Sequence, residues 1–266
     1  MALGGPRVVH DGAVMRLSGS PGWTRATTTF LDFSLRLQFR RATPGAEGAV
    51  LLRAWARRDD RWPETGYRVA LRSITSAADA GRTVAGFSSV VSVVVPSSST
   101  VPSNDEDWHD LEVTCQGDRL SIRIDGRTVA EVADGLEPGA GYIGLEQVKG
   151  TMEYRELRVT LVPVTTGPAD GQRIVGKNAP GVTSPRVITE VAPRYTIEAL
   201  GRVKGTLRLE CVVGPDGRVA DTHIVSALDP GLDLQGIAAA RHWRFEPAKL
   251  NGQPIPIIVT LELDFR

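Results

Sequence analysis

The chain ends with RHWRFEPAKLNGQPIPIIVTLELDFR, residues 241–266, and this stretch decides the fold of its C-terminal part. From residue 257 onward, apolar and polar side chains alternate, as they do on a strand with one buried face. The apolar face holds Ile257, Val259, Leu261, Leu263 and Phe265, and the polar face holds Ile258, Thr260, Glu262 and Asp264. Pro256 cannot donate to a β-ladder, so the pattern predicts a strand at the edge of a sheet.

Upstream of this strand, Trp243 and Phe245 alternate with Arg244 and Glu246. The dipeptide at residues 251–252 is Asn-Gly, which adopts the positive φ angles of tight hairpin turns. We therefore expect the two segments to form a hairpin, with Trp243 in the core.

The preceding segments complete a small α+β domain. A strand face of Leu207, Leu209, Cys211 and Val213 closes at a turn, GPDG, and residues 219–228 return as a second strand. Asp233 can cap a helix over residues 234–242.

Short motifs follow one another through this region. They are PRY at 193–195, VKGT at 203–206, PDGRV at 215–219, GLD at 231–233, WRF at 243–245 and NGQP at 251–254. In this order they resemble the TonB C-terminal domain family. The resemblance implies a periplasmic domain over residues 186–266 that binds outer-membrane transporters by strand addition. It makes Ile257, Ile258, Val259, Thr260, Leu261, Glu262 and Leu263 the strand offered to a partner.

The N-terminal part alternates in the same way over many short segments. Phe33, Leu35, Leu37 and Phe39 share one face, and further strands are expected at residues 49–55, 67–71, 111–115, 120–124, 128–132, 142–146 and 152–161. Short strands joined by Gly-containing turns, without a helical period, predict an all-β sandwich over residues 1–162.

Several motifs in this part define a second resemblance. They are GAVLLR at 48–53, GY at 66–67, DWHDLE at 107–112, GDRL at 117–120, IDG at 124–126, GYIGL at 141–145 and YREL at 154–157. Together they are similar to the 3-keto-disaccharide hydrolase family, which implies a concanavalin-like jelly-roll sandwich. In that family a strand reading GYEVQ and a Leu-Gln followed by a histidine supply the concave face. Here residues 66–70 read GYRVA and residues 145–148 read LEQV, so two expected proton-transfer groups are replaced.

Composition separates the two parts and limits the partners. Residues 163–193 hold five prolines and four glycines, so we expect a linker at 163–185 whose later part can lie along the second domain. Lysine plus arginine equal aspartate plus glutamate at 31 each, which argues against nucleic acid as a partner. Cys115 and Cys211 are expected to be buried free thiols, although an interdomain disulfide or a metal site is also open.

The sequence shows neither a signal-peptide pattern at its start nor 18 consecutive apolar residues, which predicts a soluble chain without a membrane span. This differs from the TonB pattern, in which a membrane helix and a Pro-rich spacer come first. Localisation in the periplasm or outside the cell rests on the family resemblance.

No cofactor or metal is expected, because the four histidines lack ligand spacing and no phosphate-binding loop is present. Arg53, Trp55, Trp62, Tyr67 and Glu146 could line a ligand groove, since aromatic rings stack on sugars and arginine donates to hydroxyls. Trp55 and Tyr67 could equally be core residues, and Trp62 could fill a loop.

Two function classes follow. The first is a cell-envelope interaction protein, whose sandwich binds a glycan or protein and whose TonB-like domain adds an extended peptide of an envelope protein. The alternative is a keto-sugar hydrolase or lyase with an altered site, in which Arg53 and Glu146 would be the catalytic residues.

Overall fold

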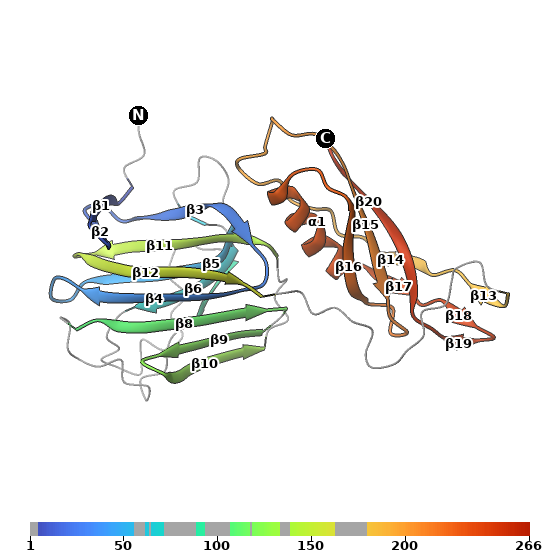
Figure 1. Cartoon of the computed structure of the whole chain (residues 1–266), viewed down its shortest axis with the longest axis horizontal. Helices are drawn as coiled ribbons and strands as arrows, with labels where there is room; N and C mark the ends of the chain where they lie inside the picture. Colours follow the sequence, from blue (N-terminus) through green and yellow to red (C-terminus); the bar gives the residue numbers. More distant parts are fainter. Residues whose placement is uncertain are drawn as a thin grey trace. The chain divides into compact units, whose positions relative to one another are not determined.

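The computed structural model describes residues 5–55, 62–63, 65–71, 89–93, 107–117, 119–133, 139–162 and 180–266. It divides the chain into two compact units, residues 1–162 and 163–266. The first is an all-β jelly-roll sandwich, and the second is a small α+β domain with one helix (Figure 1). This confirms the predicted fold class.

The sandwich consists of two facing sheets. The seven-stranded sheet has the order β1-β2-β12-β4-β8-β9-β10, and the five-stranded sheet has the order β3-β11-β5-β6-β7. The strands of the first are β1 (Arg7–Asp11), β2 (Val14–Ser18), β12 (Met152–Leu161), β4 (Phe33–Arg41), β8 (His109–Gln116), β9 (Arg119–Ile124) and β10 (Arg127–Ala133). Those of the second are β3 (Gly22–Phe30), β11 (Gly141–Lys149), β5 (Glu47–Trp55), β6 (Thr65–Leu71) and β7 (Ser89–Val93), of which β7 runs parallel to β6.

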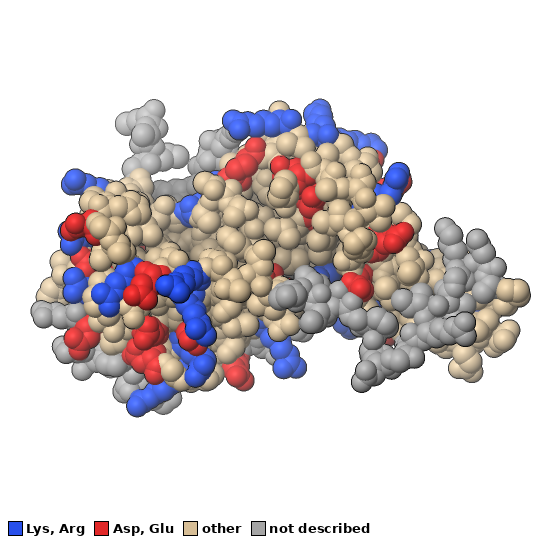
Figure 2. Space-filling view, in the orientation of Figure 1, with Lys and Arg blue, Asp and Glu red and all other residues tan. Residues whose placement is uncertain are grey.

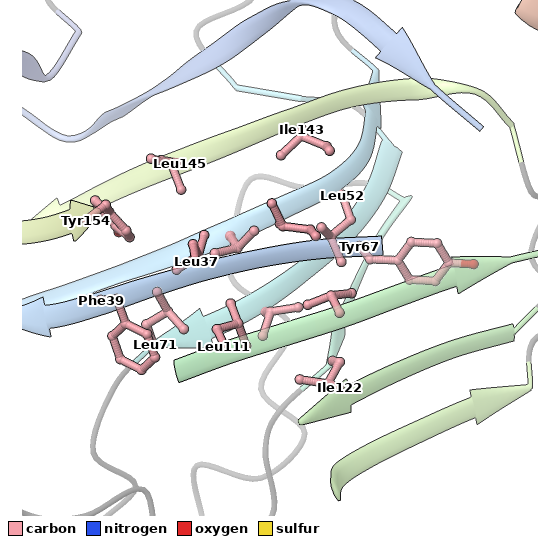
Figure 3. Close-up of a cluster of buried hydrophobic side chains, with 14 of the residues drawn as sticks. Leu37, Phe39, Leu52, Tyr67, Leu71, Leu111, Ile122, Ile143, Leu145 and Tyr154 are labelled. Carbon is pink, nitrogen blue, oxygen red and sulfur yellow. The ribbon is translucent and has the colours of Figure 1, made fainter. Parts of the chain in front are cut away.

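The core of the sandwich lies between these sheets. Alternate residues of β4 point inward, and they meet inward-facing residues of β5, β6, β8 and β11 (Figure 3). Strand alternation accounts for this packing, because each segment predicted from period two buries one face. The sequence did not indicate β1, β2 and β3 in advance.

The described residues of the C-terminal domain form three small sheets and one helix. The main sheet has the order β16-β15-β20, from β15 (Gly205–Val213), β16 (Val219–Ser226) and β20 (Ile257–Phe265). β14 (Arg186–Thr189) pairs with β17 (Arg244–Glu246), and β18 (Lys249–Leu250) pairs with both β13 (Val182–Thr183) and β19 (Gln253–Pro254). Helix α1 (Pro230–His242) packs against β15 and β16.

The predicted hairpin between residues 243–246 and 257–265 is wrong. β17 pairs with β14, and β20 pairs along its whole length with β15. The turn at Asn251 and Gly252 does form, with φ angles of 53° and 85°, but it joins only the two-residue strands β18 and β19. A ladder of nine residue pairs buries more apolar surface than a short hairpin does, so β15 takes the partner position.

The helix begins earlier than predicted. Asp229 is its N-cap, and the carboxylate of Asp229 accepts from the backbone N–H groups of Gly231 and Leu232. Pro230 follows the cap at the first helical position, where its fixed φ angle suits a helix. Asp233 lies in the first turn and accepts from the backbone of Leu228 and Asp229.

The structure also bears on the predicted linker and on the two cysteines. Residues 163–179 of the predicted linker lie outside the described residues, whereas residues 182–183 form β13 against the C-terminal domain. Cys115 and Cys211 are free and buried, as predicted, and burial raises the pKa of each thiol to about 12.

Candidate functional site

The outer face of the five-stranded sheet carries a buried ion pair between Arg68 of β6 and Glu146 of β11. Because side chains alternate along a strand, Tyr67 and Leu145 point into the core while Arg68 and Glu146 point away from it. The Nε atom of Arg68 donates to Oε2 of Glu146 at 2.5 Å, and the two side chains are only 9% and 3% exposed. Both side chains of the pair are thus largely closed to solvent.

The ion pair crosses a strand. β5 lies between β6 and β11, and its residue Ala49 is in register with both Glu146 and Ala70. The methyl groups of Ala49 and Ala70 leave room for the long side chain of Arg68 to reach over β5. Larger side chains at these positions would obstruct the contact.

Burial sets the proton affinity of the carboxyl group in this pair. Loss of solvent raises the pKa of Glu146 above its ordinary value, although the charge and the hydrogen bond of Arg68 oppose the shift. Glu146 is therefore an acid of increased proton affinity that is held by a cation.

The pair joins two positions at which the chain departs from the motifs of the keto-disaccharide hydrolase family, while Ala70 and the missing histidine are not part of it. Arg68 stands where that family's GYEVQ strand has its glutamate, and Glu146 stands where its Leu-Gln has the glutamine. The structure shows that the two replacements contact each other.

Arg53 is a structural clamp at the end of β5. It has a φ angle of 47° and is 5% exposed. Its guanidinium donates to the backbone oxygens of Leu31 (2.7 Å) and Gly117 (2.8 Å) and forms an ion pair with Asp32 (3.0 Å). A side chain at Gly141 would collide with the Arg53 backbone, so the irregular strand end is tightly packed. Arg53 therefore ties the end of β5 to neighbouring loops.

The structure does not place the five predicted groove residues on one surface. Tyr67 belongs to the core between the sheets (Figure 3), whereas Glu146 lies on the opposite face of its sheet. Trp55 and Trp62 are half-buried. Of the five residues, the outer face of this sheet holds Glu146.

Sequence reasoning missed other residues of this face. The ring of Trp23 lies against Gly144, where a Cβ atom would be 2.6 Å from Cε3 of the indole. The guanidinium of Arg25 lies 4.0 Å from the ring centre of Tyr142, and Trp23 is in register with Glu146. The alternation of Trp23 and Arg25 within residues 22–30 was the signal that could have identified β3.

The second candidate site is the free edge of β20. β20 pairs with β15 from Phe265 opposite Gly205 to Ile257 opposite Val213, without a break in register. In an antiparallel pair, the backbone groups of alternate residues point away from the partner strand. Within the described part of the chain, no strand pairs with the other side of β20. The predicted edge position is therefore found, over a strand of nine residues.

The opposite edge of this sheet is less regular. The pairing of β16 with β15 shifts register between Arg208 and Leu209 and again between Val212 and Val213. Such bulges twist a strand edge and hinder the addition of another strand. β20 is therefore the better template of the two.

Two of the solvent-facing side chains of β20 are acidic, and each has a polar partner on β15. Arg208 forms an ion pair with Glu262 at 2.8 Å, and the hydroxyl group of Thr206 donates to Asp264 at 2.7 Å. Ile258, in contrast, is 41% exposed. On this face the first half of the strand is uncharged and the second half is acidic.

The described residues contain no cluster of three or more His, Cys, Asp or Glu side chains arranged for a metal ion. No helix among them is long and apolar enough to cross a membrane.

Comparison with known proteins agrees with this division into two units. By its fold, the protein is a jelly-roll sandwich joined to an α+β domain of the TonB type. Residues 2–160 match the 3-keto-alpha-glucoside-1,2-lyase-like domain, and the chain belongs to that family. Residues 192–266 match the C-terminal domain of the Gram-negative bacterial TonB protein.

Individual proteins show the same pattern. The TonB protein of Klebsiella pneumoniae is 30% identical over 106 residues, and the match spans 39% of this chain and 42% of that protein. This chain thus corresponds to less than half of the length of that relative.

Among solved structures, a putative glycosyl hydrolase from Parabacteroides distasonis has a TM-score of 0.46 at 14% identity, covering 58% of this chain and 90% of its own. The carbohydrate-binding module CBM66 from Bacillus subtilis has a TM-score of 0.42 at 16% identity, covering 58% and 91%.

Proposed function

We propose that this protein is an interaction protein of the bacterial cell envelope whose C-terminal domain binds an extended peptide along β20. The single observation that carries the proposal is the regular edge of this nine-residue strand, with which no strand of the described residues pairs. An added peptide strand would obtain main-chain hydrogen bonds from the alternate residues of β20 that point outward. The match to the TonB C-terminal family supports this function and the periplasmic location.

The charges on β20 favour a particular kind of peptide. Glu262 and Asp264 are directed outward near the C-terminal end of the strand, and like charges placed opposite each other destabilise a sheet. These carboxylates disfavour acidic peptides and pairing with a second copy of β20. A neutral or basic extended segment fits the edge best.

The proposal can be tested with two synthetic nine-residue peptides that alternate valine with lysine or valine with glutamate. Calorimetric titration into the full chain should give tighter binding of the lysine peptide, by about two- to tenfold, because two exposed ion pairs each contribute little. Equal binding of both peptides would contradict the predicted charge preference.

A matched pair of variants tests the edge itself. The N–H groups of adjacent strand residues point to opposite sides, so only one of Ile258→Pro and Val259→Pro removes a donor from the free edge. The other removes a ladder bond to β15. We expect one variant to lose peptide binding with a nearly unchanged melt and the other to lower the melting temperature. Retained binding in both variants would refute strand addition at β20.

For the sandwich we propose a binding role on the outer face of the five-stranded sheet, toward a glycan or a protein. Glu146 and Trp23 are the candidates on this face, and Trp55 and Trp62 remain candidates beside it. Arg68 holds the carboxylate of Glu146 in an ion pair, which favours binding over proton transfer. Arg53 and Tyr67 would support such a site from the interior.

A second candidate function is lysis or hydrolysis of keto-glycosides with Glu146 as the acid. The raised pKa of Glu146, on the face where the family places its acids and amides, is the observation in its favour. This function is tested by incubating the intact protein with 3-keto-glucosides and measuring the sugar released. Absence of turnover by the folded protein would rule this function out, and turnover that survives Glu146→Gln would rule out the assigned residue.

A further inference from the structure

The outer face of the seven-stranded sheet carries a second polar arrangement, separate from both sites above. Arg16 of β2, Glu153 of β12 and Arg40 of β4 lie directly opposite one another across three neighbouring strands. Their strand neighbours Leu17, Met152 and Phe39 point into the core, so the row faces outward. Figure 2 shows that acidic and basic side chains gather on this face, over β12, β4 and β8.

Glu153 fixes the two arginines in place. Its Oε1 atom accepts from Nε and Nη2 of Arg16 at 2.7 and 2.6 Å, and its Oε2 atom accepts from Nε of Arg40 at 2.5 Å. Burial alone would raise the pKa of Glu153, but the hydrogen bonds from both arginines outweigh burial and lower the pKa. The carboxylate therefore stays ionised, and both of its oxygen atoms are already engaged.

The two arginines keep donors to spare. A guanidinium has five N–H donors, and the contacts with Glu153 use only some of them. The side chains of Arg16 and Arg40 are 44% and 36% exposed, whereas that of Glu153 is 1% exposed. Trp108 also holds Arg40, with 4.8 Å between the guanidinium carbon and the ring centre. The cations are thus preordered, which reduces the entropy lost when a ligand binds.

These side chains border a pocket of about 490 Å³. The residues that line it are Arg16, Arg40, Arg41, Ala42, Thr43, Thr151 and Glu153. Three arginines against one glutamate leave a formal charge of +2 along the wall, and among the described residues no second acid lines the pocket. Its volume lies within the range of small-molecule sites and exceeds the need of a bare ion.

We propose that this pocket binds a saccharide-sized ligand that carries an oxyanion, either a carboxylate or a phosphate group. Arginine matches both groups through paired N–H donors, and the threonines add polar groups suited to sugar hydroxyls. The proposal does not rest on the function proposed above, because this pocket lies on the other sheet of the sandwich and far in sequence from β20.

The test uses the full chain and four probes: glucuronate, glucose 6-phosphate, glucose and inorganic phosphate. Calorimetric titration should show that one or both sugar acids bind, that glucose does not, and that inorganic phosphate binds more weakly than the sugar acids. Carboxylate and phosphate sources are distinguished by which sugar acid binds more tightly. Equal binding of inorganic phosphate and the sugar acids, or no binding of either sugar acid, would overturn the proposal.

Variants locate the site. Arg16→Gln should weaken binding of the sugar acid about tenfold, because it removes a charge-assisted contact. Arg36→Gln is the matched control, since Arg36 is exposed on the same face in an ion pair with Glu112 but does not line the pocket. Melting curves confirm that each variant is folded. Equal losses in Arg16→Gln and Arg36→Gln would show nonspecific charge attraction and refute the site.

Discussion

Removing either partner of the Arg68–Glu146 pair should destabilise the sandwich far more than removing both. Glu146→Leu leaves a buried guanidinium without its carboxylate, and Arg68→Met leaves a buried carboxylate without its cation. Breaking a buried ion pair in this way costs about 3–5 kcal/mol of unfolding free energy. In a domain of this size such a loss corresponds to a drop of roughly 6–20 °C in melting temperature. The double variant replaces the pair with apolar side chains and should lie within about 1 kcal/mol of the parent.

The two single variants should differ in their response to pH. Arg68→Met removes the influences that lower the pKa of Glu146, while burial continues to raise it above the ordinary value of 4.5. An acid whose folded pKa is raised stabilises the fold fully below its ordinary pKa and loses this contribution as pH rises through the folded pKa. The deficit of Arg68→Met should therefore be small near pH 4 and grow toward neutral pH. The deficit of Glu146→Leu should change in the opposite direction and shrink as pH rises through the folded pKa, because the variant lacks the group whose raised pKa stabilises the parent at low pH.

Urea unfolding of the full chain at several pH values, with each variant compared to the parent at the same pH, measures these effects. The transition that belongs to the sandwich is the one that Trp243→Ala leaves in place. Additive losses in the double variant, or a deficit of Arg68→Met that does not depend on pH, would refute the view that the two side chains form one coupled pair.

Two further predictions concern the domains. Trp243→Ala should lower the unfolding free energy of the C-terminal domain by about 3–5 kcal/mol and leave the transition of the sandwich unchanged. The reason is that Trp243 is 6% exposed, packs on Phe245 and donates from Nε1 to the backbone oxygen of Val191. An almost unchanged melting temperature with lost peptide binding would instead show that Trp243 is a surface contact. The two domains should each unfold cooperatively when they are expressed separately, and calorimetry of the fragments checks this. The fragments are residues 1–162 and the C-terminal domain. The sequence predicts that this domain begins at residue 186, but a fragment that begins at residue 180 keeps β13.

The sequence indicated which face of a strand is buried more reliably than which strand is its neighbour. The alternation of Leu261, Leu263 and Phe265 correctly predicted their burial, because the period of a strand is a local property. Pairing depends on residues far away in the chain, so β15 could not be identified as the partner of β20 from the terminal stretch alone. The Asn-Gly turn was recognised correctly, but its hairpin ends after two residue pairs.

The candidate site in the sandwich was harder to predict for a similar reason. Arg68 and Glu146 are 78 residues apart; Arg68 looked like the loss of a family carboxylate, and Glu146 was predicted as a site residue without its partner. Only the sheet order, with β5 between the two strands, shows that they compensate each other. Tyr67 was assigned to a groove because aromatic residues bind sugars, yet its neighbour Arg68 is the residue that faces outward.

The two halves of β20 suggest how a peptide would begin to pair with it. Ile258 and Thr260 carry no charge, so the backbone beside them can be desolvated at little cost. Glu262 forms an ion pair with Arg208, and Asp264 accepts a hydrogen bond from the hydroxyl group of Thr206. A strand that pairs beside these solvated carboxylates must leave both contacts in place. Pairing should therefore start at the half that contains Ile258 and extend toward the acidic half only when the peptide supplies basic or neutral side chains there. Hydrogen exchange during peptide titration should show protection of Ile258–Thr260 before protection beyond Glu262, and simultaneous protection of both halves would contradict this order.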